Sequence, residues 1–142
     1  MPLEIREQPG AAEVFASLRD RDIRVVLNTG YDRATAEGLL EKLGWRIGDQ
    51  IDDLVTASDV QGGHPGPDMI HHAMRSRVIR ESRRMIKIGD SQVDIDEGRN
   101  ADCGMTIGIT TGAHDRTQLA ASGATAIIDR LSDLPAKIGL AG

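Results

Sequence analysis

Two aspartates four positions apart, Asp90 and Asp94, directly follow a short apolar segment of the chain. Residues four apart share one face of a helix, so a helix that begins here directs both carboxylates into the same cavity. Mg²⁺ prefers oxygen ligands and usually keeps several waters beside one or two protein carboxylates, so the spacing indicates a Mg²⁺ site. In a second interpretation, Asp90 caps the helix and Asp94 is a favourable acid in its first turn. The spacing alone leaves both interpretations open.

A polar corner, Asn28-Thr29-Gly30, ends another apolar run. A threonine hydroxyl and free backbone N–H groups at such a corner can bind a phosphate oxygen, and the N-terminus of a following helix strengthens this attraction. The alternative is a plain turn in which Gly30 takes a positive φ. The corner is therefore a candidate phosphate site.

A stiff loop carries a third candidate, His64, ahead of Pro65-Gly66-Pro67-Asp68. Its two prolines fix their φ angles, and Asp68 can cap the helix that follows. His64 is placed where a cation would reach the same cavity as the aspartates, although a lone histidine in a loop is more often a bystander. His71 and His72 are typical of a solvated helix face, and His114 is a weak candidate after a strand pattern.

Short apolar segments alternate with helical patterns along the whole chain. Strands are predicted over 23–27, 54–57, 85–88, 105–109 and 125–128, and helices over 11–19, 32–43, 68–76, 90–101, 117–122 and after 131. Such alternation predicts an α/β fold with a doubly wound, mainly parallel sheet. In these sheets functional groups gather at the carboxyl ends of the strands, where the threonine corner and the aspartate pair both stand.

The composition limits the classes of partner. The 142 residues predict a single domain over 1–142. Acidic residues outnumber basic ones 22 to 17, and the aromatic residues are one Phe, one Tyr and one Trp, which argues against nucleic acid as a partner. One cysteine excludes an internal disulfide, and no apolar stretch approaches the ~18 residues of a membrane span. Without a secretory signal, a cytoplasmic location is expected.

Taken in order, these segments resemble the haloacid dehalogenase-like (HAD) hydrolases, and they are most similar to the phosphonatase-like and phosphoglycolate-phosphatase-like branch. The likeness runs from about Pro9 to Pro135. The family's second motif, a strand ending in Thr or Ser, is matched by Val25-Val26-Leu27-Asn28-Thr29-Gly30. Its third, Lys or Arg before Pro-x-Pro, is matched in frame with His64 at the cation position. Its fourth, Gly-Asp with a second Asp four residues later, is matched by Gly89-Asp90 and Asp94.

This resemblance implies a HAD-like Rossmannoid core and Mg²⁺-dependent hydrolysis of a small phosphorylated metabolite, a phosphomonoester or a phosphonate-like compound. In the family, the phosphoryl group passes to an aspartate, and water then hydrolyses the aspartyl-phosphate. By resemblance, Thr29 and Gly30 would hold the phosphate, Thr29 and His64 would be catalytic, and Asp90 and Asp94 would serve the metal.

The sequence departs from the family at its first motif, Asp-x-Asp at the end of the first strand. Met1–Gln8 contains no aspartate, and Asp20-Arg21-Asp22 precedes a strand instead of ending one. No cap domain is predicted either. We therefore expect a HAD-like core without its first strand, leaving a gap, a re-paired sheet, or an edge open to a homodimer partner or a missing N-terminal segment. The alternative is a non-catalytic HAD-derived domain that binds metal or phosphate and acts with a partner chain.

Overall fold

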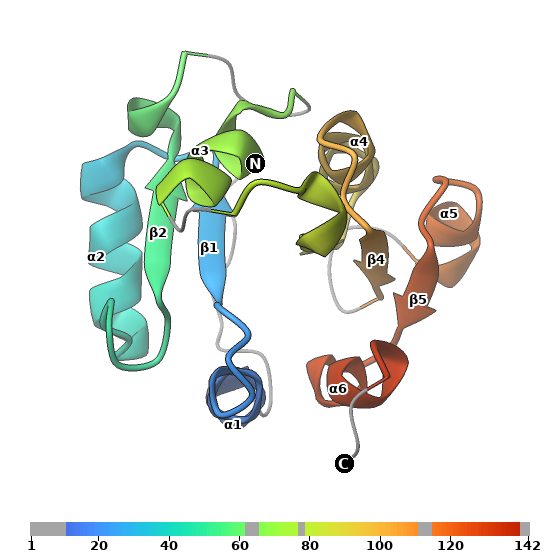
Figure 1. The fold of residues 1–142 in the computed structure, drawn as a ribbon, viewed down its shortest axis with the longest axis horizontal. Helices are drawn as coiled ribbons and strands as arrows, with labels where there is room; N and C mark the ends of the chain where they lie inside the picture. The colour runs from blue at the N-terminus through green and yellow to red at the C-terminus, as the bar shows by residue number, and fades with distance from the viewer. Residues whose placement is uncertain (1–10, 62–65, 77–78, 111–114, 140–142) are drawn as a thin grey trace.

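The computed structural model describes residues 11–61, 66–76, 79–110 and 115–139, in which strands alternate with helices (Figure 1). The strands are β1 (Val26–Thr29), β2 (Asp53–Thr56), β3 (Ile86–Gly89), β4 (Met105–Ile109) and β5 (Ala126–Ile128). The helices are α1 (Ala11–Arg19), α2 (Arg33–Leu43), α3 (Asp68–Ser76), α4 (Gln92–Asn100), α5 (Arg116–Ala120) and α6 (Leu134–Lys137), with short 3-10 turns η1 (Ala57–Asp59), η2 (Ser82–Arg84) and η3 (Leu131–Asp133).

The helices cover both faces of the strands, as the doubly wound prediction requires. α3 and α4 lie on one side, and α1 and α6 lie on the other (Figure 1). Every strand pair within the described ranges is parallel, which confirms the predicted α/β class. None of the helices in these ranges has the length and apolar character needed to cross a membrane.

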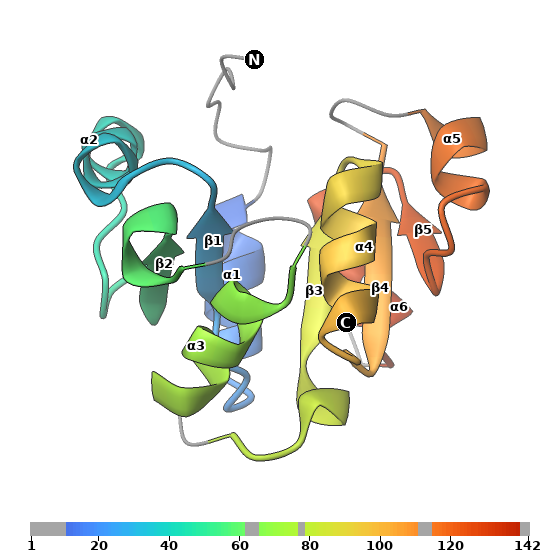
Figure 2. The ribbon, with the colours of Figure 1, turned by 90° about the horizontal axis from the view of Figure 1, so that it is seen from above.

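The strands form two parallel sheets instead of one. β1 pairs with β2, from Val26 beside Asp53 to Thr29 beside Thr56, whereas β3, β4 and β5 form the second sheet. No described residue pairs β1 with β3, although the two strands are neighbours in space (Figure 2). Of the arrangements expected for a core without its first strand, the described residues therefore have the gap, which lies between β1 and β3. The homodimer and the partner segment stay predictions.

One apolar core joins the two sheets on the side covered by α1. The apolar side chains of α1, Val14, Phe15 and Leu18, are buried, and they belong to the same cluster as Leu54 of β2 and Ile107 of β4. Burial of an apolar side chain of this size contributes about 1.5–3 kcal/mol. Helix α1 therefore holds together two sheets that share no ladder of hydrogen bonds.

Helix α2 has a well-formed cap at each end. The Asp32 carboxylate accepts a hydrogen bond from the Thr35 N–H at 2.8 Å, and this bond lowers the pKa of Asp32. Gly44 follows the helix with a φ of 73°, a left-handed conformation that glycine adopts without a steric penalty. Together these caps place the start of α2 directly after the Asn28-Thr29-Gly30 corner.

Strand β1 begins at Val26 and not at Ile23, so the predicted start was wrong. The Val25 N–H donates to the Asp52 carboxylate at 2.7 Å, and the Val25 C=O accepts from the Asp52 N–H at 2.8 Å. A side chain thus replaces a ladder bond immediately before the strand. Such a contact with a residue far along the chain is invisible to local strand propensity.

Candidate active site

Thr29, the phosphate-site candidate, is the last residue of β1 and is half-buried. Its hydroxyl oxygen accepts a hydrogen bond from the Tyr31 N–H at 3.2 Å, which tightens the corner between β1 and α2. The hydroxyl still has its own proton to donate, as contact with a phosphate oxygen requires. The alternative of a turn with Gly30 at positive φ is wrong, because the described glycines with positive φ are Gly44, Gly48, Gly123 and Gly139.

Asp90 and Asp94 come together at the carboxyl end of β3. One oxygen of Asp94, Oδ2, accepts hydrogen bonds from the Asp90 N–H at 3.1 Å and from the Ser91 hydroxyl at 3.2 Å. Ser91 occupies the N-cap position of α4, without a capping hydrogen bond from its side chain, so the interpretation in which Asp90 caps this helix is wrong. Asp94 does lie in the first turn, where a carboxylate interacts favourably with the helix dipole.

Gly89 allows this approach, because no side chain fits between the end of β3 and Asp94. A Cβ atom placed on Gly89 would collide with the Asp94 side chain. Gly98 plays the same part further along α4, where an added Cβ would lie 2.8 Å from the Lys87 Cβ. The two glycines let α4 lie directly against β3. The glycine before Asp90 therefore has a steric role, because a side chain at this position would displace Asp94.

The donor set at this edge suits Mg²⁺. Asp90 and Asp94 supply two carboxylates, and the described part of the chain has no cluster of three or more His, Cys, Asp or Glu suited to a metal. Mg²⁺ is commonly held by one or two carboxylates while water and substrate oxygens complete its octahedron. Structural zinc sites, in contrast, need four protein ligands. The residues present therefore fit Mg²⁺ as the metal implied by the fourth motif.

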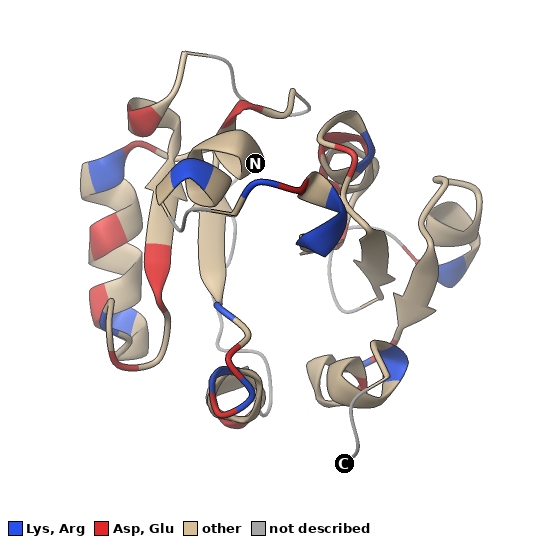
Figure 3. Cartoon of the chain, viewed as in Figure 1, with Lys and Arg blue, Asp and Glu red and all other residues tan. Residues whose placement is uncertain are grey.

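A buried charged group that sequence reasoning missed connects the two sheets. Most charged residues lie on helices and loops (Figure 3), but Lys87 is only 8% exposed and Glu97 is 0% exposed. Lys87 Nζ forms an ion pair with Glu97 Oε1 at 2.8 Å and donates to Asn28 Oδ1 at 2.8 Å. The Asn28 amide donates to Glu97 Oε2 at 3.1 Å. We call Asn28, Lys87 and Glu97 the cross-sheet cluster.

The cross-sheet cluster also reaches the aspartate pair, since Lys87 Nζ lies 3.8 Å from Asp94 Oδ1. The sequence carries two signals for it: a lysine inside an apolar strand, and a glutamate three residues after Asp94 on the same helix face. Burial of two charges costs several kcal/mol per ion unless they pair with good geometry. The pairing is predictable only once α4 is known to lie on β3.

His64, the third candidate, lies outside the described residues.

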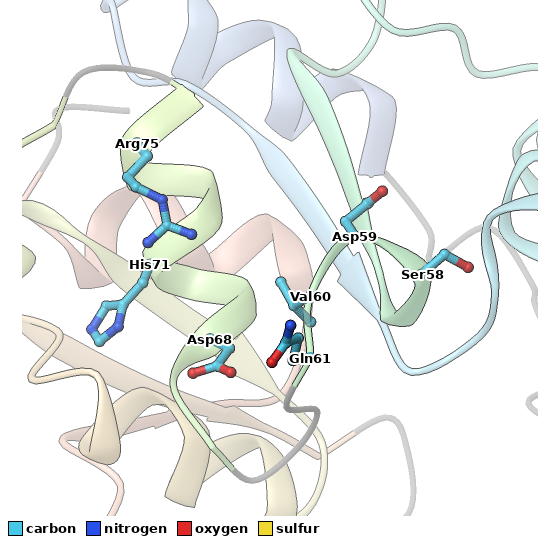
Figure 4. A pocket seen from close by; sticks show the side chains of 7 residues that line it. All are labelled: Ser58, Asp59, Val60, Gln61, Asp68, His71 and Arg75. Atoms are coloured by element: carbon cyan, nitrogen blue, oxygen red, sulfur yellow. The ribbon is translucent and has the colours of Figure 1, made fainter.

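A cavity of about 500 Å³ lies beyond the end of β2, and its lining includes Asp68, His71 and Arg75 of α3 (Figure 4). At its rim, the hydrogen bond from Arg33 lowers the pKa of Asp59 to about 2. Neither Thr29 nor the aspartate pair lines this cavity, which separates it from the edge described above.

Asp20 and Asp22 lie between α1 and β1, at the amino end of that strand as predicted. Since β1 has four residues, three steps of ~3.3 Å put its first and last Cα atoms about 10 Å apart. Both aspartates are therefore remote from Thr29, which ends β1. Neither Asp20 nor Asp22 is therefore a candidate for the aspartate nucleophile of the family's reaction.

A family model for haloacid dehalogenase-like hydrolases matches residues 3–102, a region that runs through β1 and β3 and includes Thr29, Asp90 and Asp94. The chain belongs to this family. The match confirms the family predicted from the order of the sequence motifs. The arrangement of Thr29, Asp90 and Asp94 is therefore interpreted by comparison with HAD-type hydrolases.

Two phosphonatase-type proteins and a phosphatase are among the similar proteins. The phosphonoacetaldehyde hydrolase of Parabacteroides distasonis is 31% identical over 92% of this chain and 57% of its own length. A structure of a phosphonoacetaldehyde hydrolase-like protein from Oleispira antarctica has a TM-score of 0.79 at 27% identity, covering 92% of this chain and 55% of that one. A predicted phosphoglycolate phosphatase from Haemophilus somnus, with a TM-score of 0.79 at 20% identity over 94% of this chain and 57% of its own, shares the fold. The HAD chain therefore spans a little more than half the length of these proteins.

Proposed function

We propose that this chain forms the phosphate- and metal-binding part of a Mg²⁺-dependent phosphohydrolase acting on a small phosphomonoester or phosphonate. One observation carries the proposal: Asp94 folds back onto the Asp90 N–H at the carboxyl end of β3, beside a cross-sheet cluster that includes the residue before Thr29. Phosphoryl transfer depends mostly on positioning and on offsetting oxyanion charge, which such an edge can supply. Similarity to phosphonoacetaldehyde hydrolases makes a phosphonate the first substrate class to test.

Asp90 and Asp94 are the residues that would hold the metal. Mg²⁺, when bound, neutralises charge on phosphoryl oxygens. Asp94 is oriented for this role by the Asp90 N–H and the Ser91 hydroxyl, which both bond to Oδ2. The other oxygen, Oδ1, lies on the side of Lys87. Removing either carboxylate is therefore expected to weaken metal binding.

Thr29, Gly30 and His64 would hold the phosphate. The Thr29 hydroxyl donates to a phosphate oxygen, and Gly30 offers its backbone N–H without a side chain to obstruct the ligand. His64 takes the family's cation position. An unperturbed histidine titrates near ~6.5 and is mostly uncharged at neutral pH, but a bound phosphate stabilises the charged form and raises its pKa.

In the proposed reaction, an aspartate oxygen attacks phosphorus while the bond to the leaving group breaks. Water then attacks the phosphorus of the aspartyl-phosphate, which frees the aspartate and releases inorganic phosphate. Asp20 and Asp22 are at the opposite end of β1, and Asp94 and Asp96 belong to α4. Asp-x-Asp occurs in this sequence only at these two pairs, and neither pair ends a strand, so we assign the nucleophile to another segment, in a longer protein or in a partner chain.

Hydrolysis assays on the chain alone test this assignment. Phosphonoacetaldehyde and p-nitrophenyl phosphate are incubated with the protein and Mg²⁺, and release of phosphate or p-nitrophenol is followed. Binding of inorganic phosphate without turnover is the expected result. Mg²⁺-dependent turnover that Asp90→Asn abolishes would place the nucleophile within this chain instead. Asp96→Asn, on the helix α4 that follows Asp90, is the matched control.

A further inference from the structure

The two halves of the candidate active site stand on different sheets. Thr29 ends β1, in the sheet formed with β2, whereas Asp90 and Asp94 follow β3, in the sheet formed with β4 and β5. In a continuous sheet, the backbone ladder fixes the spacing and register of neighbouring strands. Here no ladder joins β1 to β3 within the described residues. Other contacts must therefore set the relative position of the two halves.

The apolar core supplies cohesion but little register. Helix α1 contacts apolar side chains of both sheets, as described above. Hydrophobic attraction is non-directional, so it resists separation of the sheets more than it resists sliding of one along the other. Hydrogen bonds with fixed donor and acceptor geometry resist sliding, because they weaken steeply when misaligned.

The cross-sheet cluster provides such bonds at the level of the site. Asn28 precedes Thr29 and uses both ends of its amide: the oxygen accepts from Lys87 and the nitrogen donates to Glu97. Lys87 lies on β3, two residues before Gly89, and Glu97 lies on α4 one turn after Asp94. Both partners are almost fully buried, which shields these charge-assisted bonds from water. One residue of β1 is thereby tied to the strand and the helix that carry the aspartates.

We propose that Asn28 is a positioning residue: through Lys87 and Glu97 it sets the register between the Thr29 half and the Asp90–Asp94 half of the site. Its consequence for catalysis rests on the proposed function, but the register itself does not. Loss of the two Asn28 bonds leaves the Lys87–Glu97 ion pair intact, so the fold persists while the halves move relative to each other. A misplacement of ~1 Å at a catalytic site can lower the rate by about 100-fold.

A distance measurement between the halves tests the proposal. Spin labels are attached to Glu41→Cys on α2 and Thr117→Cys on α5, both exposed, in a Cys103→Ser background. Pulsed electron paramagnetic resonance then gives the distance distribution for the parent and for Asn28→Ala. Gln92→Ala is the matched control, since Gln92 also makes two amide hydrogen bonds, to Asp96 and Ser122, but within the second half alone.

The expected result is a narrow distribution in the parent and in Gln92→Ala, and a broadened or shifted one in Asn28→Ala, by up to about one strand spacing of ~4.8 Å. An unchanged distribution in a cooperatively folding Asn28→Ala protein would overturn the proposal. If Asn28→Ala does not fold, Asn28→Ser, which keeps a polar group too short to reach Lys87, replaces it. Failure of both to fold beside a folded Gln92→Ala would also overturn it, by making Asn28 a stability residue.

The same variants separate this inference from the proposed function. If the protein binds phosphate with Mg²⁺, Asn28→Ala is expected to weaken that binding at least about 10-fold, and Gln92→Ala less than about 2-fold. If the parent binds no phosphate, the proposed function fails. The distance distributions still decide whether Asn28 sets the register.

Discussion

Replacing Lys87 by methionine is expected to destabilise the fold severely. Methionine preserves much of the length of the side chain but removes its charge, and Glu97, which is 0% exposed, then keeps a carboxylate inside the fold without its ammonium partner. Breaking a buried pair by removing one partner typically costs about 3–5 kcal/mol. Against a total stability of ~5–15 kcal/mol this is at least about a fifth of the folding free energy, and at roughly 3–4 °C per kcal/mol it corresponds to a fall in Tm of about 10–20 °C.

The magnitude is measured by urea unfolding followed by circular dichroism, on a cycle of four proteins. Lys87→Met and Glu97→Gln are made singly and together. The double variant should recover most of the loss, because it leaves no unpaired charge inside the protein. Its neutral amide still offers Asn28 an acceptor.

An exposed ion pair provides the control for this cycle. Arg116 and Asp129 approach to 2.7 Å, as closely as Lys87 and Glu97, but their side chains are 55% and 60% exposed. Arg116→Met should therefore change stability far less, since water solvates the carboxylate left behind. Equal losses for Lys87→Met and Arg116→Met, or a double variant no more stable than Lys87→Met, would show that the buried carboxylate of Glu97 does not cause the loss of stability.

Three further outcomes are expected. Gly89→Ala should weaken Mg²⁺ binding and lower the Tm, because the new Cβ collides with Asp94; calorimetry on a Gly38→Ala control, where an added Cβ meets nothing within 4 Å, measures the difference. Arg33→Gln should reduce stability at pH 4–7 and flatten the acid dependence of stability. The pKa of Asp59 is lowered to about 2 in the folded protein, so the pairing adds stability above the pKa of the unfolded state, and this stability is lost as the pH falls toward 2. Identical acid titrations of the parent and the variant would contradict the pairing. Phosphate binding should weaken as pH rises through the pKa of His64, and His64→Lys should flatten that profile; an unchanged profile removes His64 from the site.

Much of the fold could be predicted because its signals are local. The limits of α1, the Asp32 and Gly44 caps of α2 and the extent of α3 follow from short-range patterning and capping chemistry, and the structure has them at those residues. The alternation of apolar and helical segments likewise predicts parallel strands. Such features depend on neighbours within one or two helical turns.

The remaining features depend on contacts between distant segments. The start of β1 is set by Asp52, and the buried state of Lys87 is set by Asn28 and Glu97. No local sequence pattern predicts that these residues are in contact. The closeness of Asp90 and Asp94 was predictable from their spacing, but a shared helix was not found, because α4 begins at Gln92 and Asp90 precedes it. The contact of Asp94 Oδ2 with the Asp90 N–H requires the close packing that Gly89 permits.

Binding of inorganic phosphate in the presence and absence of Mg²⁺ tests directly whether the aspartate pair holds a metal beside a phosphate site. Titration calorimetry at pH 6.5 compares the parent protein with Asp90→Asn and with Asp96→Asn, whose carboxylate bonds to Gln92 on the same helix. Mg²⁺ is expected to strengthen phosphate binding at least about 10-fold, or ~1.4 kcal/mol, in the parent and in Asp96→Asn, whereas Asp90→Asn should lose this effect. Phosphate binding that does not depend on Mg²⁺, or that is weakened equally by Asp90→Asn and Asp96→Asn, would contradict a metal-binding role of the aspartate pair.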